Sequence, residues 1–202
     1  MKILAPLSLS LSLALASCHS LTDHVDWVDY GEDPMQNPQY MADMTAAGAP
    51  GPEHEALARR AGSWKVEGKT WMAPGTDPMP MQATARIDVL LGGRVTIEEF
   101  ESDFMGMPFE GRLVQGFDNL SGEYWSLWTD NMSTGYFISQ GTETSPGSVE
   151  LRGSARDILT PNGRPVRMIT TDNGDGTYTM RMFDTREDSG EFQSMELLYT
   201  RG

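Results

Sequence analysis

The chain has 202 residues, and its 29 acidic side chains outnumber its 15 basic ones, giving a formal net charge of −14. Such a charge leaves no basic surface to release counterions from phosphates, which argues against nucleic acid and anionic membrane surfaces as partners. Because Cys18 is the only cysteine, no disulfide can form within the chain, and the folded part has no cysteine for a nucleophile or a metal site.

The first 17 residues are typical of a signal peptide. Lys2 supplies an early cation, an apolar run rich in Leu, Ala and Ser follows, and small residues lead up to Cys18. The apolar run is shorter than the roughly 17–25 residues that a membrane-spanning helix needs. We therefore expect residues 1–17 to be removed on export.

Residues 15–18, with the sequence Leu-Ala-Ser-Cys, resemble the lipobox of bacterial lipoproteins. The resemblance implies cleavage before Cys18, diacylglycerol on its sulfur and an acyl chain on its new amino terminus, which together anchor a protein to a membrane. His19, in place of Asp, follows the pattern of outer-membrane sorting. The expected location is the cell envelope, on the periplasmic side of the outer membrane. The alternative is an ordinary secreted protein with a chance cysteine at its cleavage site.

Residues 18–52 are expected to form a lipidated, acidic and flexible tether. They show no sustained period of two or of 3.6, and acids, prolines and glycines interrupt them throughout. The bulky groups Trp27, Tyr30 and Tyr40 are either idle linker residues or a docking motif. After the tether, Pro52 and two acids favour the start of a short helix that ends before Gly62.

From residue 63 onward, apolar and polar side chains alternate in short runs separated by turn residues. About ten strands fit between residues 63 and 201, which predicts one all-β domain over residues 53–202. A long series of hairpins has to deal with its edges, and closure removes them. We therefore expect an antiparallel up-and-down closed barrel of 8–10 strands, wide enough inside for side chains or one small ligand. A sandwich of two sheets is the alternative.

Two resemblances support the barrel. Gly62-Ser63-Trp64, at the start of the first strand, resembles the Gly-x-Trp start of calycins, the barrels of the lipocalin and nitrobindin type. It implies that Gly62 and Trp64 form the barrel floor and that a late arginine, here Arg201, lies over the Trp. Over about residues 53–201 the chain also resembles domain of unknown function 1579, through LLGGR (90–94), EEFES (98–102), GMPFEGR (106–112), GFDN (116–119), YWSLWTD (124–130) and MELLYTR (195–201). That resemblance implies a calycin-like barrel and carries over no active site.

Histidine usage bears on the cofactor. A related barrel class binds haem through a histidine inside the barrel, but here His19, His24 and His54 all precede the first strand. We therefore expect no haem and no other cofactor. The shortage of His and Cys also argues against a zinc or copper site, and the absence of a histidine after residue 54 argues against Ser/His/Asp catalysis.

The candidate binding residues come from strand faces. Alternation places Glu98 and Phe100 on one face, while the neighbouring carboxylates are expected to face solvent. If Glu98 points inward, burial raises the pKa of its carboxyl group and makes it a candidate acid or ligand anchor. The expected lining of a ligand cavity is Glu98, Phe100, Tyr124, Trp128, Tyr136, Met168, Met180 and Met182. The alternative is that these side chains fill a solid core.

Three hypotheses for function remain open. The first is that a small apolar or amphipathic ligand binds inside the barrel, because methionine and aromatic side chains suit an adaptable apolar lining. The second is a structural or assembly role in the envelope, with the barrel's outer face or the tether as a protein-docking surface. The third is an enzyme that uses Glu98 or another buried carboxylate, and no catalytic residue is assigned for it.

Overall fold

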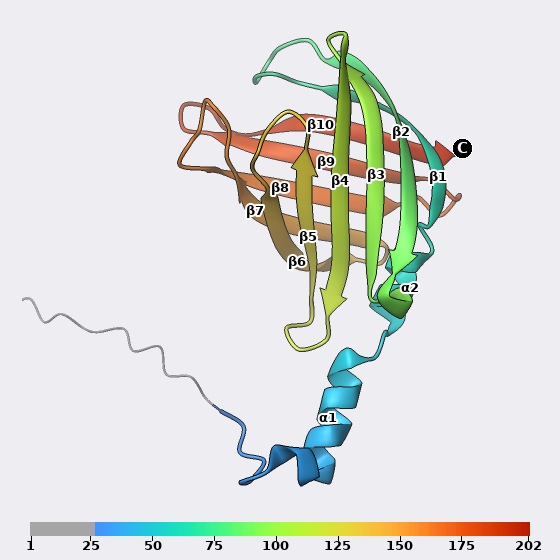
Figure 1. Ribbon diagram of the computed structural model, residues 1–202. Coiled ribbons are helices and arrows are strands. Elements are labelled where there is room, and N and C mark those ends of the chain that lie inside the picture. The colour runs from blue at the N-terminus through green and yellow to red at the C-terminus, as the bar shows by residue number, and fades with distance from the viewer. Residues whose placement is uncertain (1–26) are drawn as a thin grey trace, which may run out of the picture.

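Ten antiparallel strands close into one barrel in a computed structural model of the protein, which describes residues 27–202 (Figure 1). The expected signal peptide, Cys18, His19 and His24 lie outside the described residues. The strands are β1 (Gly62–Thr70), β2 (Met79–Leu90), β3 (Val95–Phe104), β4 (Met107–Asp118), β5 (Glu123–Asp130), β6 (Phe137–Ser145), β7 (Ser148–Ala155), β8 (Arg164–Asp172), β9 (Tyr178–Arg186) and β10 (Gly190–Arg201). The prediction of an up-and-down barrel is confirmed, and the sandwich alternative is wrong.

Each strand pairs with its neighbours in sequence, and the barrel closes where β1 pairs with β10. In that last pairing Trp64 lies opposite Arg201 and Thr70 lies opposite Met195. The turns between strands contain the expected Gly, Asn and Pro residues. The shortest have two residues each, Met105 and Gly106 between β3 and β4, and Pro146 and Gly147 between β6 and β7. Closure leaves no free sheet edge among these ten strands, which removes the main aggregation hazard of an all-β chain.

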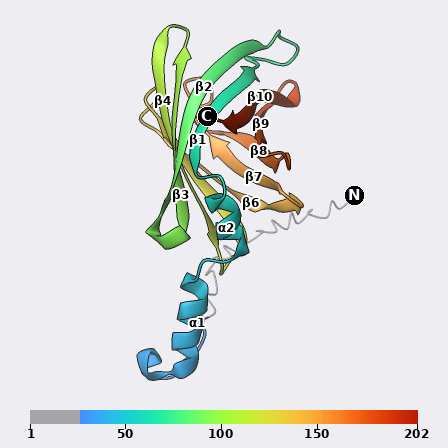
Figure 2. The same cartoon turned by 90° about the vertical axis from the view of Figure 1, so that its right-hand side faces the viewer.

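The short helix α2 (Pro52–Ala58) lies at one end of the barrel, close to β3 and β4 (Figure 2). Its start is as expected, with Pro52 at the first turn and two glutamates nearby. Leu57 packs with Tyr124 and Leu151 from the barrel, and the ring of His54 meets Phe117 edge-on at 5.8 Å. A helix of this length is stable only when it is packed on another surface. Here that surface is the end of the barrel, which α2 covers.

The tether contains regular structure that the sequence pattern did not predict. A 3₁₀ turn, η1 (Pro34–Gln36), precedes the helix α1 (Pro38–Gly48), which extends away from the barrel in Figures 1 and 2. The side chain of Asn37 caps α1 by accepting the backbone N–H groups of Gln39 and Tyr40. None of its residues is buried, and its sequence has no sustained apolar period, which is why periodicity missed it.

Two contacts hold the ends of the segment that contains η1 and α1. The ring of Tyr30 meets that of Tyr40 edge-on at 5.1 Å, so these aromatics contact each other. At the other end, the amide of Asn119 in the β4–β5 turn donates to the backbone carbonyls of Ala46, Ala47 and Ala49. The expectation of a tether without regular structure is therefore wrong for residues 34–48.

The barrel floor is built from β1, β10 and the turn after α2. The guanidinium carbon of Arg201 lies 4.0 Å from the centre of the Trp64 ring, as the calycin resemblance implies. Arg201 also donates to the carbonyls of Ala61 and Arg59, at 2.6 and 2.8 Å. Gly62 has φ of +124°, and a Cβ there would lie 2.7 Å from Nη1 of Arg201. Only glycine fits between the turn and the arginine.

Candidate functional site

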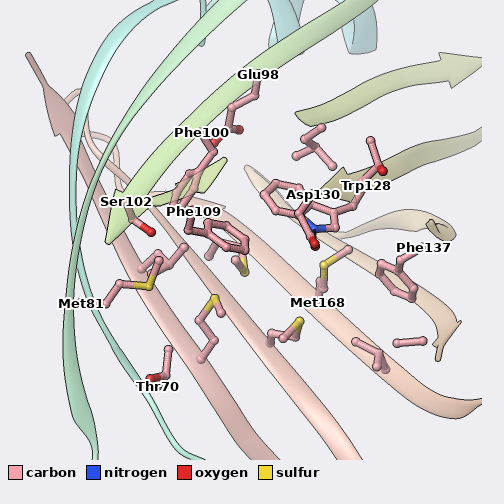
Figure 3. Close-up of a pocket in the computed structure, with 18 of the residues that line it drawn as sticks. Thr70, Met81, Glu98, Phe100, Ser102, Phe109, Trp128, Asp130, Phe137 and Met168 are labelled. Atoms are coloured by element: carbon pink, nitrogen blue, oxygen red, sulfur yellow. Dashed lines mark hydrogen bonds between the residues drawn. The ribbon is translucent and has the colours of Figure 1, made fainter. Parts of the chain in front are cut away.

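The inside of the barrel holds a cavity of about 880 Å³ rather than a solid core (Figure 3). It runs from Leu57 and Arg60, beside α2, to the loops at the other end, where Met105, Tyr136 and Arg156 line it. Ligand cavities in proteins usually measure 300–1,000 Å³. The interior is therefore large enough for a small organic molecule, and the alternative of a filled core is wrong.

The middle of the cavity is apolar and carries most of the barrel's bulky side chains. Phe100, Phe109 and Trp128 form an aromatic cluster with ring centres 6.1–6.3 Å apart. Across from them β8, β9 and β10 contribute a set of methionines, joined by one from β2: Met81, Met168, Met180, Met182 and Met195. Methionine side chains are unbranched and polarisable, so such a wall adapts to the shape of an apolar ligand.

The position of Trp128 depends on a glycine in the next strand. Gly111 on β4 faces inward, and a Cβ at that position would lie 2.2 Å from the Trp128 ring. The indole therefore occupies the space that a side chain at residue 111 would take. Its Nε1 donates to Oδ2 of Asp130 at 2.8 Å, which holds the ring in one orientation. Together these two contacts fix one wall of the cavity.

The floor end of the cavity is polar. Glu98 is only 6% exposed, and its Oε1 accepts the hydroxyl of Tyr199 at 3.0 Å. The Tyr199 ring stacks on Tyr178 with ring centres 4.2 Å apart. Burial raises the pKa of the Glu98 carboxyl group from 4.5 to about 7, although the Tyr199 hydrogen bond and the charge of Arg60 act in the opposite direction. Glu98 is therefore partly protonated at neutral pH.

Burial, together with the charge of Glu98, raises the pKa values of both tyrosines well above the usual range. Both phenols therefore stay neutral and can donate hydrogen bonds. Arg60, in the turn after α2, lies with its guanidinium carbon 5.1 Å from the centre of the Tyr178 ring and also lines the cavity. Within residues 27–202 no carboxylate oxygen lies within ion-pair distance of Arg60.

The mouth of the cavity, at the end opposite α2, exposes apolar side chains. They come from the β1–β2, β3–β4, β5–β6 and β7–β8 connections and the strand ends beside them: Met72, Met79, Phe104, Met105, Met107, Met132, Tyr136, Ile138, Ile158 and Leu159. The β7–β8 loop is held by Arg164, which donates to Asp157 and Thr160 within the loop and to Asp184 on β9. An apolar molecule thus meets apolar side chains at the entrance as well as inside.

Seven of the expected cavity residues line it: Glu98, Phe100, Trp128, Tyr136, Met168, Met180 and Met182. Tyr136 lies at the mouth and is 70% exposed, because it belongs to the β5–β6 loop rather than to a strand. Tyr124 is a correction. It shares a face with Trp128, but it lies at the α2 end of β5, where it packs against Leu57 and Phe117 and does not line the cavity.

Sequence reasoning missed the polar partners of Glu98. Tyr199 is buried on the inward face of β10, and its hydroxyl meets Glu98 only after closure of the barrel. Arg60 belongs to a turn, where strand alternation gives no signal. Alternation along β4 places Phe109 on the inward face. Its proximity to Trp128 could have been inferred from the expected pairing of β4 with β5.

Two further observations concern metals and membranes. Among residues 27–202, no group of three His, Cys, Asp or Glu side chains lies close enough together to hold a metal ion. The helices in this part of the chain are too short and too polar to cross a bilayer.

The closed strand order and the internal cavity place the chain among up-and-down antiparallel β-barrel proteins. A family model described as "Protein of unknown function (DUF1579)" matches residues 49–201, so the chain belongs to this family. Among curated proteins none matches the chain. The crystal structure of Rv2717c from M. tuberculosis is similar, with a TM-score of 0.57 and 14% sequence identity, covering 76% of this chain and 99% of that one. At that identity the likeness concerns the fold alone.

Proposed function

We propose that the barrel binds one small apolar or amphipathic molecule in its interior. The observation that carries this proposal is the cavity of about 880 Å³, whose middle is lined by aromatic and methionine side chains. An unfilled space of this size in a protein core costs stability, since its lining loses the contacts that packing would provide. A bound apolar molecule restores those contacts.

The distribution of polar groups supports a ligand that is held in one orientation. Ligand sites are mostly apolar, with a few polar groups that fix the pose. Here the polar groups at the closed end are Arg60, Glu98 and Tyr199, while Trp128 and the methionines supply apolar contact. The exposed apolar side chains at the mouth, such as Met105 and Leu159, support the passage of a poorly soluble molecule.

In this proposal the lipid expected on Cys18 holds the barrel at the periplasmic face of the outer membrane, with residues 18–52 between the anchor and the barrel. Amphipathic molecules are concentrated at such a surface. The cavity mouth lies at the end opposite α2, so helix α1, which extends from the α2 end, does not cover it (Figure 1).

The test is titration of the full chain with phenylnaphthylamine, a neutral probe whose fluorescence rises in apolar surroundings. The Met168→Trp variant places a large ring in the cavity. We expect this variant to bind the probe about tenfold or more weakly, because the ring takes up space that the probe would occupy. Ile169→Trp is the matched control, since residue 169 is on the same strand and faces outward.

Saturable binding of one probe per chain that is lost in Met168→Trp and kept in Ile169→Trp supports the proposal. Native mass spectrometry of the purified chain provides a second readout, as a mass that is added to the wild type and missing from Met168→Trp. Absence of saturable probe binding to the wild type, or equal binding by both variants, would refute binding in the cavity.

A further inference from the structure

The floor of the cavity has an unusual combination of charge and burial. Arg60 is the cation that lines the cavity at this end, and among the described residues it has no carboxylate partner at ion-pair distance. Its guanidinium lies against the face of Tyr178 and borders the cavity. A guanidinium group presents paired N–H donors that match a carboxylate, and a half-buried cation without a counter-charge is a favourable place for an anion.

Glu98 presents one oxygen to this end of the cavity. Its Oε1 is occupied by the Tyr199 hydroxyl, and no protein donor within residues 27–202 contacts Oε2. No fully buried side-chain oxygen in this part of the chain lacks a hydrogen-bond partner, so Oε2 is reachable from the cavity. When Glu98 is protonated, Oε2–H can donate to a ligand, and when it is ionised, it repels an anion.

The other polar side chains around Glu98 are neutral. Thr96 on the same strand, Gln115 on β4 and Thr170 on β8 line the floor, as do the hydroxyl-bearing Tyr178 and Tyr199. The other charged or titratable groups at this end do not line the cavity. Arg59, Glu143 and Asp172 border a smaller hollow beside Tyr124. Arg201 lies over Trp64, and Nδ1 of His54 accepts the backbone N–H of Gly51. A ligand head at the floor therefore meets one cation and one acid, Arg60 and Glu98.

We infer that the ligand is an amphipathic monocarboxylate, bound with its carboxylate at the floor between Arg60 and the protonated side chain of Glu98, and with its hydrocarbon body along the methionines. This inference rests on the proposed function and specifies the class of molecule for the same cavity. Arg60 supplies the counter-charge. Glu98 supplies a hydrogen bond only when it holds its proton, so binding of the carboxylate is coupled to proton uptake by Glu98.

The direction of the pH effect follows from this coupling. Below about pH 7 Glu98 already holds its proton and binding is strongest, whereas above that pH a proton has to be taken up with the ligand. Between about pH 6 and about pH 8 the affinity for a carboxylate is expected to fall about tenfold. The affinity for a neutral ligand of the same length should not show this fall, because its binding does not require the proton on Glu98.

The experiment compares decanoate, decanol and decylamine, which share one chain length, by titration calorimetry with the full-length protein. We expect decanoate to bind about tenfold or more tightly than the other two at about pH 6, because only the carboxylate pairs with Arg60. Arg60→Gln should remove this preference, because decanoate then loses its counter-charge. Arg59→Gln is the matched control, since Arg59 is exposed in the same turn.

Glu98→Gln provides a test that does not depend on the fold of the Arg60 variant. Glutamine keeps a hydrogen-bond donor and cannot ionise, so this variant should keep the preference for decanoate and lose the fall in affinity between about pH 6 and about pH 8. Equal binding of decanoate and decanol, or tightest binding of decylamine, would overturn the inference and leave the proposed function intact. Failure of all three compounds and of the neutral probe would instead refute the proposed function.

Discussion

The buried carboxyl group of Glu98 makes the stability of the ligand-free barrel depend on pH. In the folded chain its pKa is about 7, whereas the unperturbed value is 4.5. Between these values the folded state holds a proton that the unfolded state has released, so the free energy of unfolding decreases as the pH rises. A shift of this size corresponds to about 3 kcal/mol in total, and about 2 kcal/mol of it falls between about pH 5.5 and about pH 8.

The Glu98→Gln variant removes this dependence. Glutamine has nearly the same shape and can still accept the hydroxyl of Tyr199, but it has no proton to release. Relative to the wild type, the variant should therefore gain about 2 kcal/mol of unfolding free energy between about pH 5.5 and about pH 8. The measurement is urea denaturation of both proteins at the two pH values, followed by circular dichroism and tryptophan fluorescence.

The control for this comparison is Glu101→Gln. Glu101 is on the same strand as Glu98 but faces solvent, so its removal should change stability equally at both pH values. If Glu98→Gln follows Glu101→Gln within about 0.5 kcal/mol at both pH values, the carboxyl group is not desolvated in the folded state. Water would then reach Glu98 at the cavity floor, contrary to the burial described above.

Two further substitutions test the walls and the floor of the barrel. Gly111→Ala should force the Trp128 indole out of its position and destabilise the fold by about 1–3 kcal/mol, with a change in tryptophan emission; Gly135→Ala, in an open loop, should do neither. Arg201→Gln should lower the free energy of unfolding by about 2 kcal/mol, because it removes the contact with Trp64 and two charged hydrogen bonds to backbone carbonyls. Arg86→Gln, on the exposed face of β2, should cost much less, and equal losses in the two variants would contradict the role of Arg201 at the floor.

Strand faces could be predicted from the sequence because the period of a strand is a local property. Alternation correctly separates inward Glu98 from outward Glu101, and inward Met180 from outward Arg181. Turn residues marked most of the strand ends, because the preference of a residue for a turn is also a local property. The missed helix α1 is the complementary case, since none of its residues is buried and its sequence has no sustained apolar period to detect.

Other features were decided only by closure of the barrel. Tyr199 and Glu98 are 101 positions apart in the sequence, and their hydrogen bond forms because β10 returns to pair with β1. Tyr124 and Trp128 share one face of β5, yet only Trp128 reaches the cavity, because α2 covers the other end of the strand.

The cavity itself is the clearest example of what the tertiary structure decides. An alternating pattern looks the same whether the inward side chains meet in the middle or leave space. Which of the two occurs depends on the circumference of the ring, and therefore on the number of strands that close it. The sequence determined a closed barrel with Glu98, Trp128 and the methionines inside it. Only the assembled ring of ten strands determined that these residues surround a cavity with a polar floor.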